Sequence, residues 1–328
     1  MQAPEFWWTD GALGRMLDPL GAFYALATKR RVARPPSFSP PVPVLSIGNL
    51  VAGGAGKTPL ALAAAAWLKE QGAQPIFLSR GYGGSEVGPL RVAPSDHEPE
   101  QVGDEPLLLA RIAPTWIGRD RAAAAQAALA EPSGENRVLV LDDAHQNPAL
   151  RKDVSLVVVD GARGFGNLRC IPAGPLREPV GAGLRRAAGV VVLGAERESL
   201  KRFLSKSLPV VRGDLVPDAA TQALAGRKVV AFAGIGRPEK VLETLRQVGA
   251  RVLAFHPFAD HFPYREADIQ PILDEAYDLG AIAVTTEKDA VRLPPDQRPQ
   301  VDILRVSVGW RSEEDADGFA DLLTPLLK

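Results

Sequence analysis

Cysteine, histidine and long apolar runs are scarce in this sequence. The chain has 328 residues but only one cysteine, Cys170, and four histidines. A single cysteine excludes an internal disulfide and a zinc site built from cysteines, and it suits a reducing cytosol. No stretch reaches the roughly 18 apolar residues that a membrane-spanning helix needs. Glu5 and Asp10 precede the first basic residue, so we expect no signal peptide.

A charge excess of either sign is also absent. The 38 basic and 39 acidic residues leave a formal net charge of -1. Without a global basic field, we expect no nucleic-acid partner, and no obligate protein partner is evident from the sequence. Hydrophobic residues make up 46% and charged residues 23%, which is typical of a globular protein long enough for two domains.

Apolar runs that alternate with helical segments define the organisation. Buried strands are expected at residues 44–48, 75–79, 137–143 and 156–160, with alanine-rich helices at residues 59–69 and 120–130. This pattern predicts an α/β fold in which helices cover a mostly parallel sheet. The alternation restarts after Pro217. We therefore predict an N-terminal helix and linker (1–40), a P-loop domain (41–215) and a smaller α/β domain (216–328).

The segment at residues 6–34 combines aromatic, apolar and basic residues. Phe6, Trp7 and Trp8 precede apolar residues at helical spacing, and a basic cluster ends the segment. Such an amphipathic helix suits the surface of an anionic membrane. The pattern is equally typical of a helix docked on the protein's own core, and the residues alone do not decide between the two.

The motif with the clearest chemistry is VLSIGNLVAGGAGKT at residues 44–58. A strand, a glycine-rich turn, Lys-Thr and a helix form the context of a P-loop, whose main-chain N–H groups bind phosphates. The expected cofactor-binding positions are Gly53, Gly54, Ala55, Gly56, Lys57 and Thr58. Lys57 would contact the β- and γ-phosphates of ATP, and Thr58 would bind Mg²⁺. The usual pattern has glycine where this chain has Val51, and the alternative is a chance glycine turn.

Two adjacent carboxylates, Asp142 and Asp143, end the strand at residues 137–143. In P-loop proteins an aspartate at the end of a neighbouring strand holds Mg²⁺. The alternative is that one of them caps a helix, which explains the pair less well. We predict Asp142 as a metal ligand and Asp143 as a catalytic residue beside it.

Two further acidic positions have simple alternatives. Asp104 follows Gly103 at the start of a predicted helix, where a carboxylate is a favourable first-turn residue. Asp260 and His261 read equally as a surface turn. If a carboxylate and His261 meet in space, they form a general-base pair that can take a proton from an attacking hydroxyl.

A glycine- and proline-rich segment at residues 164–179 follows another strand. Loops at the carboxyl ends of parallel strands bind ligands in open α/β sheets. Arg177, Arg185 and Arg186 place positive charge near it, although any single arginine there is better explained as solvated surface charge.

The motifs together resemble one family, the tetraacyldisaccharide 4'-kinases, which phosphorylate lipid A precursors in Gram-negative bacteria. The matching strings, in order, are SIGNLVAGGAGKTP, LSRGYGG, GDEP, LDDAHQN, VVVDGARGFGNLRCIPAGPLREP, AFAGIGRPEK, FADH and TTEKDA. They extend over about residues 44–293. SRGYGG, GDEP and PAGPLREP are not features of P-loop proteins in general.

The resemblance implies an ATP- and Mg²⁺-dependent kinase that acts on an acylated glucosamine disaccharide phosphate. The enzyme would work as a peripheral protein at the cytoplasmic face of the inner membrane, with a smaller domain that closes over the site. It implies that Asp104 and His261 activate the sugar hydroxyl and favours membrane contact for the N-terminal helix. Weaker substrate-binding candidates are Arg80, Tyr82, Arg121, Gln146 and Glu178.

One departure and two alternatives accompany the resemblance. Ala144-His145 stands where the family usually has glycine and an apolar or aromatic residue. Ala144 fits only if the backbone there has no positive φ.

The alternatives to the kinase function are a P-loop ATPase of the partitioning or metal-insertion type, which would carry a second lysine near Ala52, and a membrane-binding module that only senses nucleotide.

Overall fold

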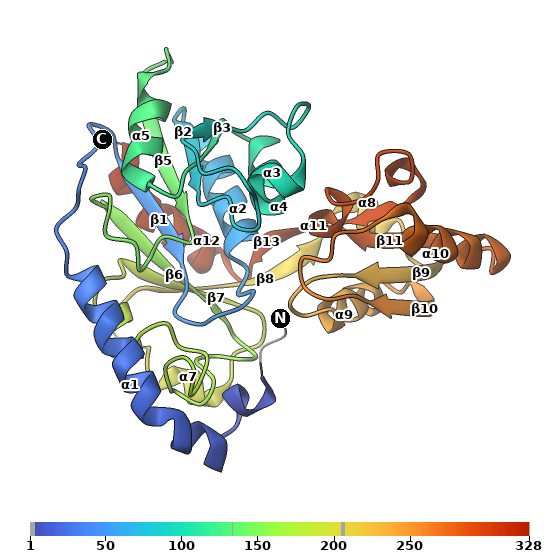
Figure 1. Ribbon diagram of the computed structural model, residues 1–328, viewed down its shortest axis with the longest axis horizontal. Coiled ribbons are helices and arrows are strands. Elements are labelled where there is room, and N and C mark those ends of the chain that lie inside the picture. Colours follow the sequence, from blue (N-terminus) through green and yellow to red (C-terminus); the bar gives the residue numbers. More distant parts are fainter. Residues whose placement is uncertain (1–3, 133, 205–206, 328) are drawn as a thin grey trace.

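The computed structural model describes residues 4–132, 134–204 and 207–327 and contains two sheets (Figure 1). The nine-stranded sheet has the order β13 (Val306–Trp310), β8 (Val210–Pro217), β7 (Gly189–Leu193), β6 (Val154–Asp160), β1 (Val44–Gly48), β5 (Arg137–Asp142), β2 (Gln74–Ser79), β4 (Thr115–Ile117) and β3 (Leu90–Arg91). The four-stranded sheet has the order β10 (Arg251–Pro257), β9 (Lys228–Ala233), β11 (Ile282–Thr286) and β12 (Asp302–Leu304).

Helices cover both sheets. Those connected with the larger sheet are α1 (Ala12–Val32), α2 (Lys57–Glu70), α3 (Pro99–Val102), α4 (Asp104–Ala110), α5 (Arg121–Ala130), α6 (Val180–Leu184), α7 (Glu198–Lys201) and α12 (Glu313–Leu323). Those connected with the smaller sheet are α8 (Ala219–Gln222), α9 (Glu239–Gln247), α10 (Glu266–Asp278) and α11 (Glu287–Ala290). Short 3-10 helices are η1 (Glu5–Trp8), η2 (Arg298–Gln300) and η3 (Thr324–Leu327). The predicted fold class is confirmed.

The chain crosses between the two sheets twice. It leaves the larger sheet after β8 and returns to it with β13, which pairs antiparallel with β8. We call the described residues up to 217 and from 306 the large lobe, and residues 218–305 the small lobe. The sequence assigns all of 216–328 to the smaller domain, whereas β13 and α12 pack with the large lobe. The physical reason is that Phe319 and Leu323 of α12 are buried in the same core as α2.

The P-loop strand lies inside the larger sheet. β1 is parallel to both β5 and β6, and Ile47 aligns with Asp142 on one side and Leu156 on the other. Because the carboxyl ends of parallel strands meet at one edge, the P-loop and the strand ends at Asp142 and Asp160 lie side by side there.

The core below this edge fixes the start of α2. Leu60, Ala64 and Leu68 of α2 are fully buried against Leu45 and Phe77 of the sheet. The alanines bring the helix close to the strands, and each fully buried large side chain contributes about 1.5–3 kcal/mol. The sheet and α2 therefore hold the intervening loop at both ends.

The helix α1 docks on the large lobe through its smallest residues. Gly14, Gly21 and Thr28 are buried, and a Cβ on Gly21 would lie 2.8 Å from the Cys170 carbonyl oxygen. The large apolar residues point outward: Leu13, Met16, Leu20, Phe23 and Leu26 are exposed. Figure 1 shows α1 on the side of the large lobe away from the small lobe.

The aromatic residues before α1 pack on the protein itself. Trp7 and Trp8 are partly buried, Trp7 Nε1 donates to the Pro172 carbonyl oxygen at 3.0 Å, and the Arg163 guanidinium lies 4.5 Å from the centre of the Trp8 ring. The two alternatives for residues 6–34, docking on the protein and an exposed apolar surface, thus apply to different parts of the segment. The aromatic cluster docks on the large lobe, while the apolar stripe of α1 remains exposed.

Candidate active site

The P-loop has the backbone that its glycines predict. α2 begins at Lys57, and Gly56 before it has a left-handed φ of 89°. A Cβ on Gly56 would lie 2.5 Å from a Leu193 methyl carbon, so side chains are excluded there. Val51, where glycine is usual, is buried and pairs with Leu176 in an isolated bridge. Its backbone needs no positive φ, which accounts for the departure from the usual pattern.

The side chain of Lys57 faces Asp143. Lys57 Nζ lies 3.7 Å from Asp143 Oδ2, and Arg177 donates two hydrogen bonds to the same carboxylate at 2.8 and 3.0 Å. Burial raises the pKa of Asp143, but Lys57 and Arg177 lower it more, so the pKa lies below its usual value. Asp143 has a positive φ of 50°, which aims its carboxylate at these cations. A phosphate bound by the loop would enter a site that already holds two cations.

Asp142 has the environment expected of a metal ligand. It is 2% exposed, and its Oδ1 has no hydrogen-bond partner among the described residues. Burial, followed by the charges of Glu105 and Asp143, raises the pKa of Asp142 to about 7. Such a carboxylate fits a site completed by a cation. The described part of the chain has no cluster of three or more acidic, histidine or cysteine residues that could hold a metal ion.

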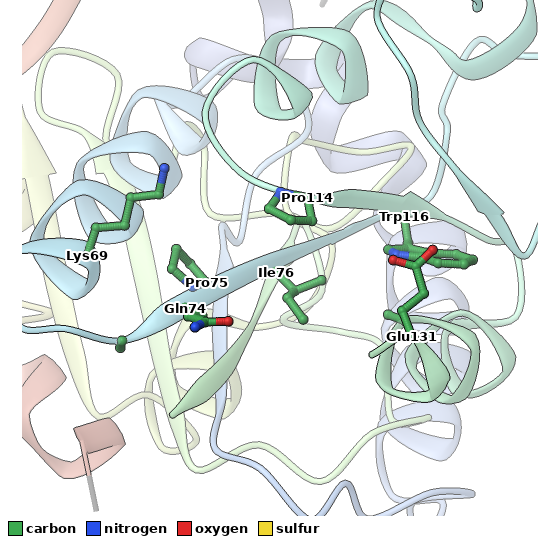
Figure 2. Close-up of a pocket in the computed structure, with 9 residues that line it drawn as sticks. Lys69, Gln74, Pro75, Ile76, Pro114, Trp116 and Glu131 are labelled. Atoms are coloured by element: carbon green, nitrogen blue, oxygen red, sulfur yellow. The ribbon is translucent and has the colours of Figure 1, made fainter. Parts of the chain in front are cut away.

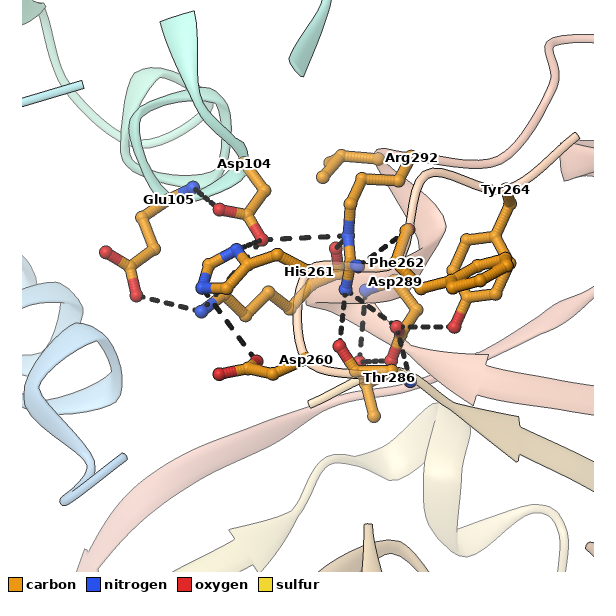
Figure 3. Close-up of polar contacts among 12 residues, drawn as sticks. Asp104, Glu105, Asp260, His261, Phe262, Tyr264, Thr286, Asp289 and Arg292 are labelled. Atoms are coloured by element: carbon orange, nitrogen blue, oxygen red, sulfur yellow. Dashed lines mark hydrogen bonds and ion pairs between the residues drawn. The ribbon is translucent and has the colours of Figure 1, made fainter. Parts of the chain in front are cut away.

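Asp104 and His261 meet across the two lobes (Figure 3). His261 Nδ1 lies 3.1 Å from Asp104 Oδ2, and His261 Nε2 lies 3.8 Å from Asp260 Oδ1. Asp104 is 3% exposed, whereas the His261 side chain is 29% exposed. Burial raises the pKa of Asp104, but the contact with His261 and two nearby cations lower it more, so the carboxyl is ionised. The tertiary structure thus creates the pair that the sequence leaves undecided.

A buried network that sequence reasoning missed holds His261 in place. His261 has a positive φ of 58°, and its N–H donates to the Gly234 carbonyl oxygen at 3.0 Å. The Arg292 guanidinium donates to the carbonyl oxygens of Gly234 and Phe262 at 3.0 and 2.9 Å. Asp289 is fully buried and accepts a 2.7 Å hydrogen bond from Arg292. The string TTEKDA contains Asp289 but carries no chemical signature of this role.

Two more contacts join the lobes. Lys288 Nζ lies 3.0 Å from Glu105 Oε1. At the end of β6, the 4% exposed Asp160 accepts hydrogen bonds from Arg237 at 2.8 Å and Lys240 at 2.7 Å. Burial raises the pKa of Asp160, but Lys240 and Arg237 lower it more. The sequence assigned no role to these residues, because their pairing joins distant segments.

The weaker substrate candidates fall into two groups. Arg80 and Tyr82 are exposed, and the Tyr82 ring centre lies 5.6 Å from that of His261, so both can meet a substrate. Arg121 is 4% exposed, and burial lowers its pKa to about 10. Gln146 and Glu178 are also buried, and Gln146 donates to Glu178 at 3.0 Å. The side chains of Arg121, Gln146 and Glu178 are therefore enclosed by the protein and less open to a substrate than Arg80 and Tyr82.

The Ala144-His145 departure is explained by the structure. Ala144 has no positive φ, so glycine is not required. His145 is 2% exposed, and its ring nitrogens lie 3.0 Å from the Ser155 hydroxyl and 3.0 Å from the Gly183 carbonyl oxygen. Since a carbonyl only accepts, Nε2 carries the proton and Nδ1 accepts from Ser155. Burial, then the charge of Arg186, lowers the pKa of His145 to about 4, so the ring adds no charge near Asp142 at neutral pH.

A separate cavity of about 230 Å³ lies away from these groups (Figure 2). Its lining includes Gln74 at the start of β2, Ile76, Pro114 and Trp116. It therefore lies towards the amino-terminal end of β2 and contains none of the candidate site residues.

Comparison with known proteins identifies the family. The family model described as tetraacyldisaccharide-1-P 4'-kinase matches residues 13–328. The chain belongs to this family. A tetraacyldisaccharide 4'-kinase of Rhodospirillum rubrum is 58% identical over 312 residues, covering 94% of this chain and 93% of the relative. One of Rhodospirillum centenum is 51% identical over 333 residues, covering 100% and 97%.

A solved structure of the kinase family agrees with the fold. The crystal structure described as an "apo" form of LpxK from Aquifex aeolicus in complex with ATP aligns with a TM-score of 0.76 and 27% identity. The alignment covers 96% of this chain and 100% of that one. The expected nucleotide of the family is thus a ligand of a solved relative.

Proposed function

We propose that the chain transfers the γ-phosphate of ATP to the 4'-hydroxyl of a tetraacyldisaccharide 1-phosphate in lipid A biosynthesis. The observation that carries this proposal is the meeting of Asp104 with His261 beside the P-loop edge. The charge of Glu105, the residue after Asp104, contributes to the raised pKa of Asp142. A nucleotide-binding edge and a proton-accepting pair are the parts that transfer to a hydroxyl requires.

The large lobe supplies the phosphate-binding groups. The main-chain N–H groups of residues 53–58 receive the phosphates, and Lys57 turns from Asp143 towards them. Thr58 and Asp142 would hold Mg²⁺, which neutralises charge on the phosphate oxygens. Asp143 contacts Lys57 beside the loop, and Arg177 in turn holds Asp143. Preorganised cations of this kind stabilise the transition state more than the bound ATP.

The small lobe supplies the group that meets the acceptor. His261 is the exposed member of its pair, so the sugar hydroxyl contacts it first. His261 takes the proton, and the ionised Asp104 orients the ring and stabilises the imidazolium. Tyr82 and Arg80 lie where they can contact the sugar or its phosphate. Closure of the lobes excludes water and limits hydrolysis of ATP.

The acceptor is a lipid, so the enzyme must reach a bilayer. None of the helices in the described residues is long and apolar enough to cross one. The exposed stripe of Leu13, Met16, Leu20 and Phe23, followed by Lys29, Arg30 and Arg31, supports peripheral contact with an anionic surface. We assign this contact to the cytoplasmic face of the inner membrane, where ATP is present.

An assay with γ-labelled ATP, Mg²⁺ and detergent-dispersed disaccharide 1-phosphate lipid tests the function. Label on the lipid, dependent on both Mg²⁺ and the acceptor, is the expected result. Label that appears only as inorganic phosphate would instead indicate an ATPase of the partitioning type, which the family relationship does not favour. Binding of ATP without any release of label would indicate a nucleotide sensor.

A further inference from the structure

A second, basic cavity lies at the carboxyl-terminal end of α1. Its volume is about 400 Å³. Val32, Arg34 and Pro36 form one wall, and the opposite walls come from the loop between β5 and β6 and from the turn before β7. The charged side chains that line it are Arg34, Arg151, Lys152, Asp153, Arg185 and Arg186. Five cations therefore surround a cavity that contains one carboxylate.

The few acids nearby are already engaged. Asp153 Oδ2 accepts from the Val44 N–H at 2.9 Å, and its Oδ1 accepts from Arg151 at 3.2 Å. Arg186 pairs with the buried Glu178 at 2.7 Å. Among the described residues, the side chains of Arg34 and Arg185 have no hydrogen-bond or ion-pair partner. The cavity thus has two unengaged guanidinium groups.

Lys152 adds a partly buried cation without a carboxylate partner. Its Nζ donates to the carbonyl oxygens of Ala144 and His145, and no acidic group of the described residues forms an ion pair with it. Burial, then the charge of Arg186, lowers the pKa of Lys152 to about 8. Buried charges in proteins are normally paired, so this ammonium lacks a compensating anion.

We propose that this cavity binds the phosphomonoester headgroup of a bilayer lipid other than the substrate. A phosphomonoester offers three terminal oxygens and up to two negative charges, which the arginine and lysine groups can bind together. Its source follows from the position of the cavity. Val32 and Arg34 continue from the basic end of α1, and a helix lying in the interface places that end among the headgroups.

This proposal rests on the proposed membrane contact of α1 but not on the kinase reaction. Bound lipid would fix the rotation of the large lobe on the bilayer as well as its attachment. The apolar stripe alone leaves that rotation free, because it lies on one helix. A lipid headgroup bound beside the carboxyl-terminal end of α1 would keep the active site at a constant distance from the bilayer surface.

The experiment measures binding of the full chain to vesicles of phosphatidylcholine containing either phosphatidic acid or phosphatidylglycerol, matched in surface charge. Wild-type protein is expected to prefer the phosphomonoester lipid about tenfold. Arg34→Gln and Arg185→Gln, which break no contact among the described residues, should remove the preference for phosphatidic acid, while binding to phosphatidylglycerol vesicles should fall no more than it does for Arg30→Gln. Both should keep wild-type transfer to a detergent-dispersed acceptor.

Arg30→Gln is the matched control, because Arg30 belongs to the same basic helix end but does not line the cavity. It should weaken binding to both vesicles equally. No preference in wild type, or equal loss of preference in Arg30→Gln, would overturn the proposal.

A second experiment titrates inorganic phosphate against the Lys57→Ala variant, in which the P-loop is disabled. Stabilisation by phosphate that depends on Arg34, without any vesicle preference, would reassign the cavity to free phosphate and overturn the lipid source.

Discussion

At the scale of single residues, the contact between Lys57 and Asp143 sets the charge at the start of α2. The two groups lie 3.7 Å apart, and Arg177 holds Asp143 in place from the other side. The positive charge of Lys57 is therefore partly neutralised by the Asp143 carboxylate, and a bound phosphate would take the place of that carboxylate. Lys57 is the first residue of α2 and is not among the buried residues of that helix. We therefore expect it to contribute positive charge in the transition state rather than packing in the core.

Lys57→Ala should lower kcat by about 10²- to 10³-fold while the protein stays folded, because the variant loses a preorganised cation and no core contact. Steady-state kinetics with labelled ATP, together with thermal melting, measures both effects. Lys69→Ala at the other end of α2 is the control and should retain activity. Near-wild-type turnover of Lys57→Ala would refute the P-loop assignment.

Asp104 and His261 should behave as one unit. Asp104→Asn and His261→Gln each remove half of the pair, so each should lower kcat by about 10²-fold or more, and the double variant should lose less than the product of the single losses. The 3.1 Å contact predicts this coupling. A double-mutant cycle on kcat measures it, with Asp302→Asn on the exposed end of β12 as a neutral control. Fully multiplicative losses would mean that the two groups act separately.

The buried His145 predicts how stability depends on pH. The pKa of His145 in the folded protein, about 4, is below its ordinary value of 6.5, so the unfolded chain takes up the proton first. The stability contribution is complete above the unfolded pKa and is lost as pH falls through the folded pKa, by up to about 3 kcal/mol. Urea unfolding across this range should show a smaller loss for His145→Gln than for wild type. His97→Gln should follow wild type, and a wild-type pH profile for His145→Gln would contradict this account.

At the scale of elements, α1 has two faces that differ in residue size. Small residues face the large lobe, because a Cβ at Gly21 would meet the Cys170 carbonyl oxygen, and the large apolar residues face outward. A helix docked only for stability would bury the large side chains instead. The arrangement therefore favours a second apolar environment outside the protein.

Leu20→Ser combined with Phe23→Ser should weaken association with anionic vesicles about tenfold or more without lowering the melting temperature. The two side chains are 57% and 73% exposed, so they lose a contact with lipid and not with the core. Vesicle co-sedimentation and thermal melting measure the two effects. Ala12→Ser combined with Ala22→Ser, also exposed on α1, is the control. A fall in melting temperature with unchanged vesicle binding would return α1 to a purely structural role.

At the scale of the whole molecule, two buried carboxylates of the large lobe bind side chains of the small lobe, one on each side of the site. Asp104 meets His261 on one side, and Asp160 meets Arg237 and Lys240 on the other. Asp160 ends the strand next to the P-loop strand, so the position of the small lobe is coupled to the nucleotide-binding edge. Removing one member of a buried ion pair leaves the other charges uncompensated.

Asp160→Asn should loosen the small lobe and lower kcat about tenfold or more, because the Asp104–His261 pair then forms less often. Small-angle scattering should show a larger radius of gyration than for wild type. Glu198→Gln, which removes an exposed pair with Lys201 in α7, is the control and should change neither quantity. An unchanged scattering profile together with full activity would show that Asp160 does not couple the lobes.

The sequence by itself determined the fold class and the P-loop, because apolar alternation and the glycine-lysine-threonine turn are local patterns. It also placed Asp142 and Asp143 at a strand end, since a buried strand followed by two carboxylates needs no distant partner to be recognised. Only the tertiary structure decided the meeting of Asp104 with His261, the Asp289–Arg292 support behind it, and the return of β13 to the larger sheet. These features join segments that are far apart in the chain or depend on buried networks, and such contacts leave no periodic signal in the chain.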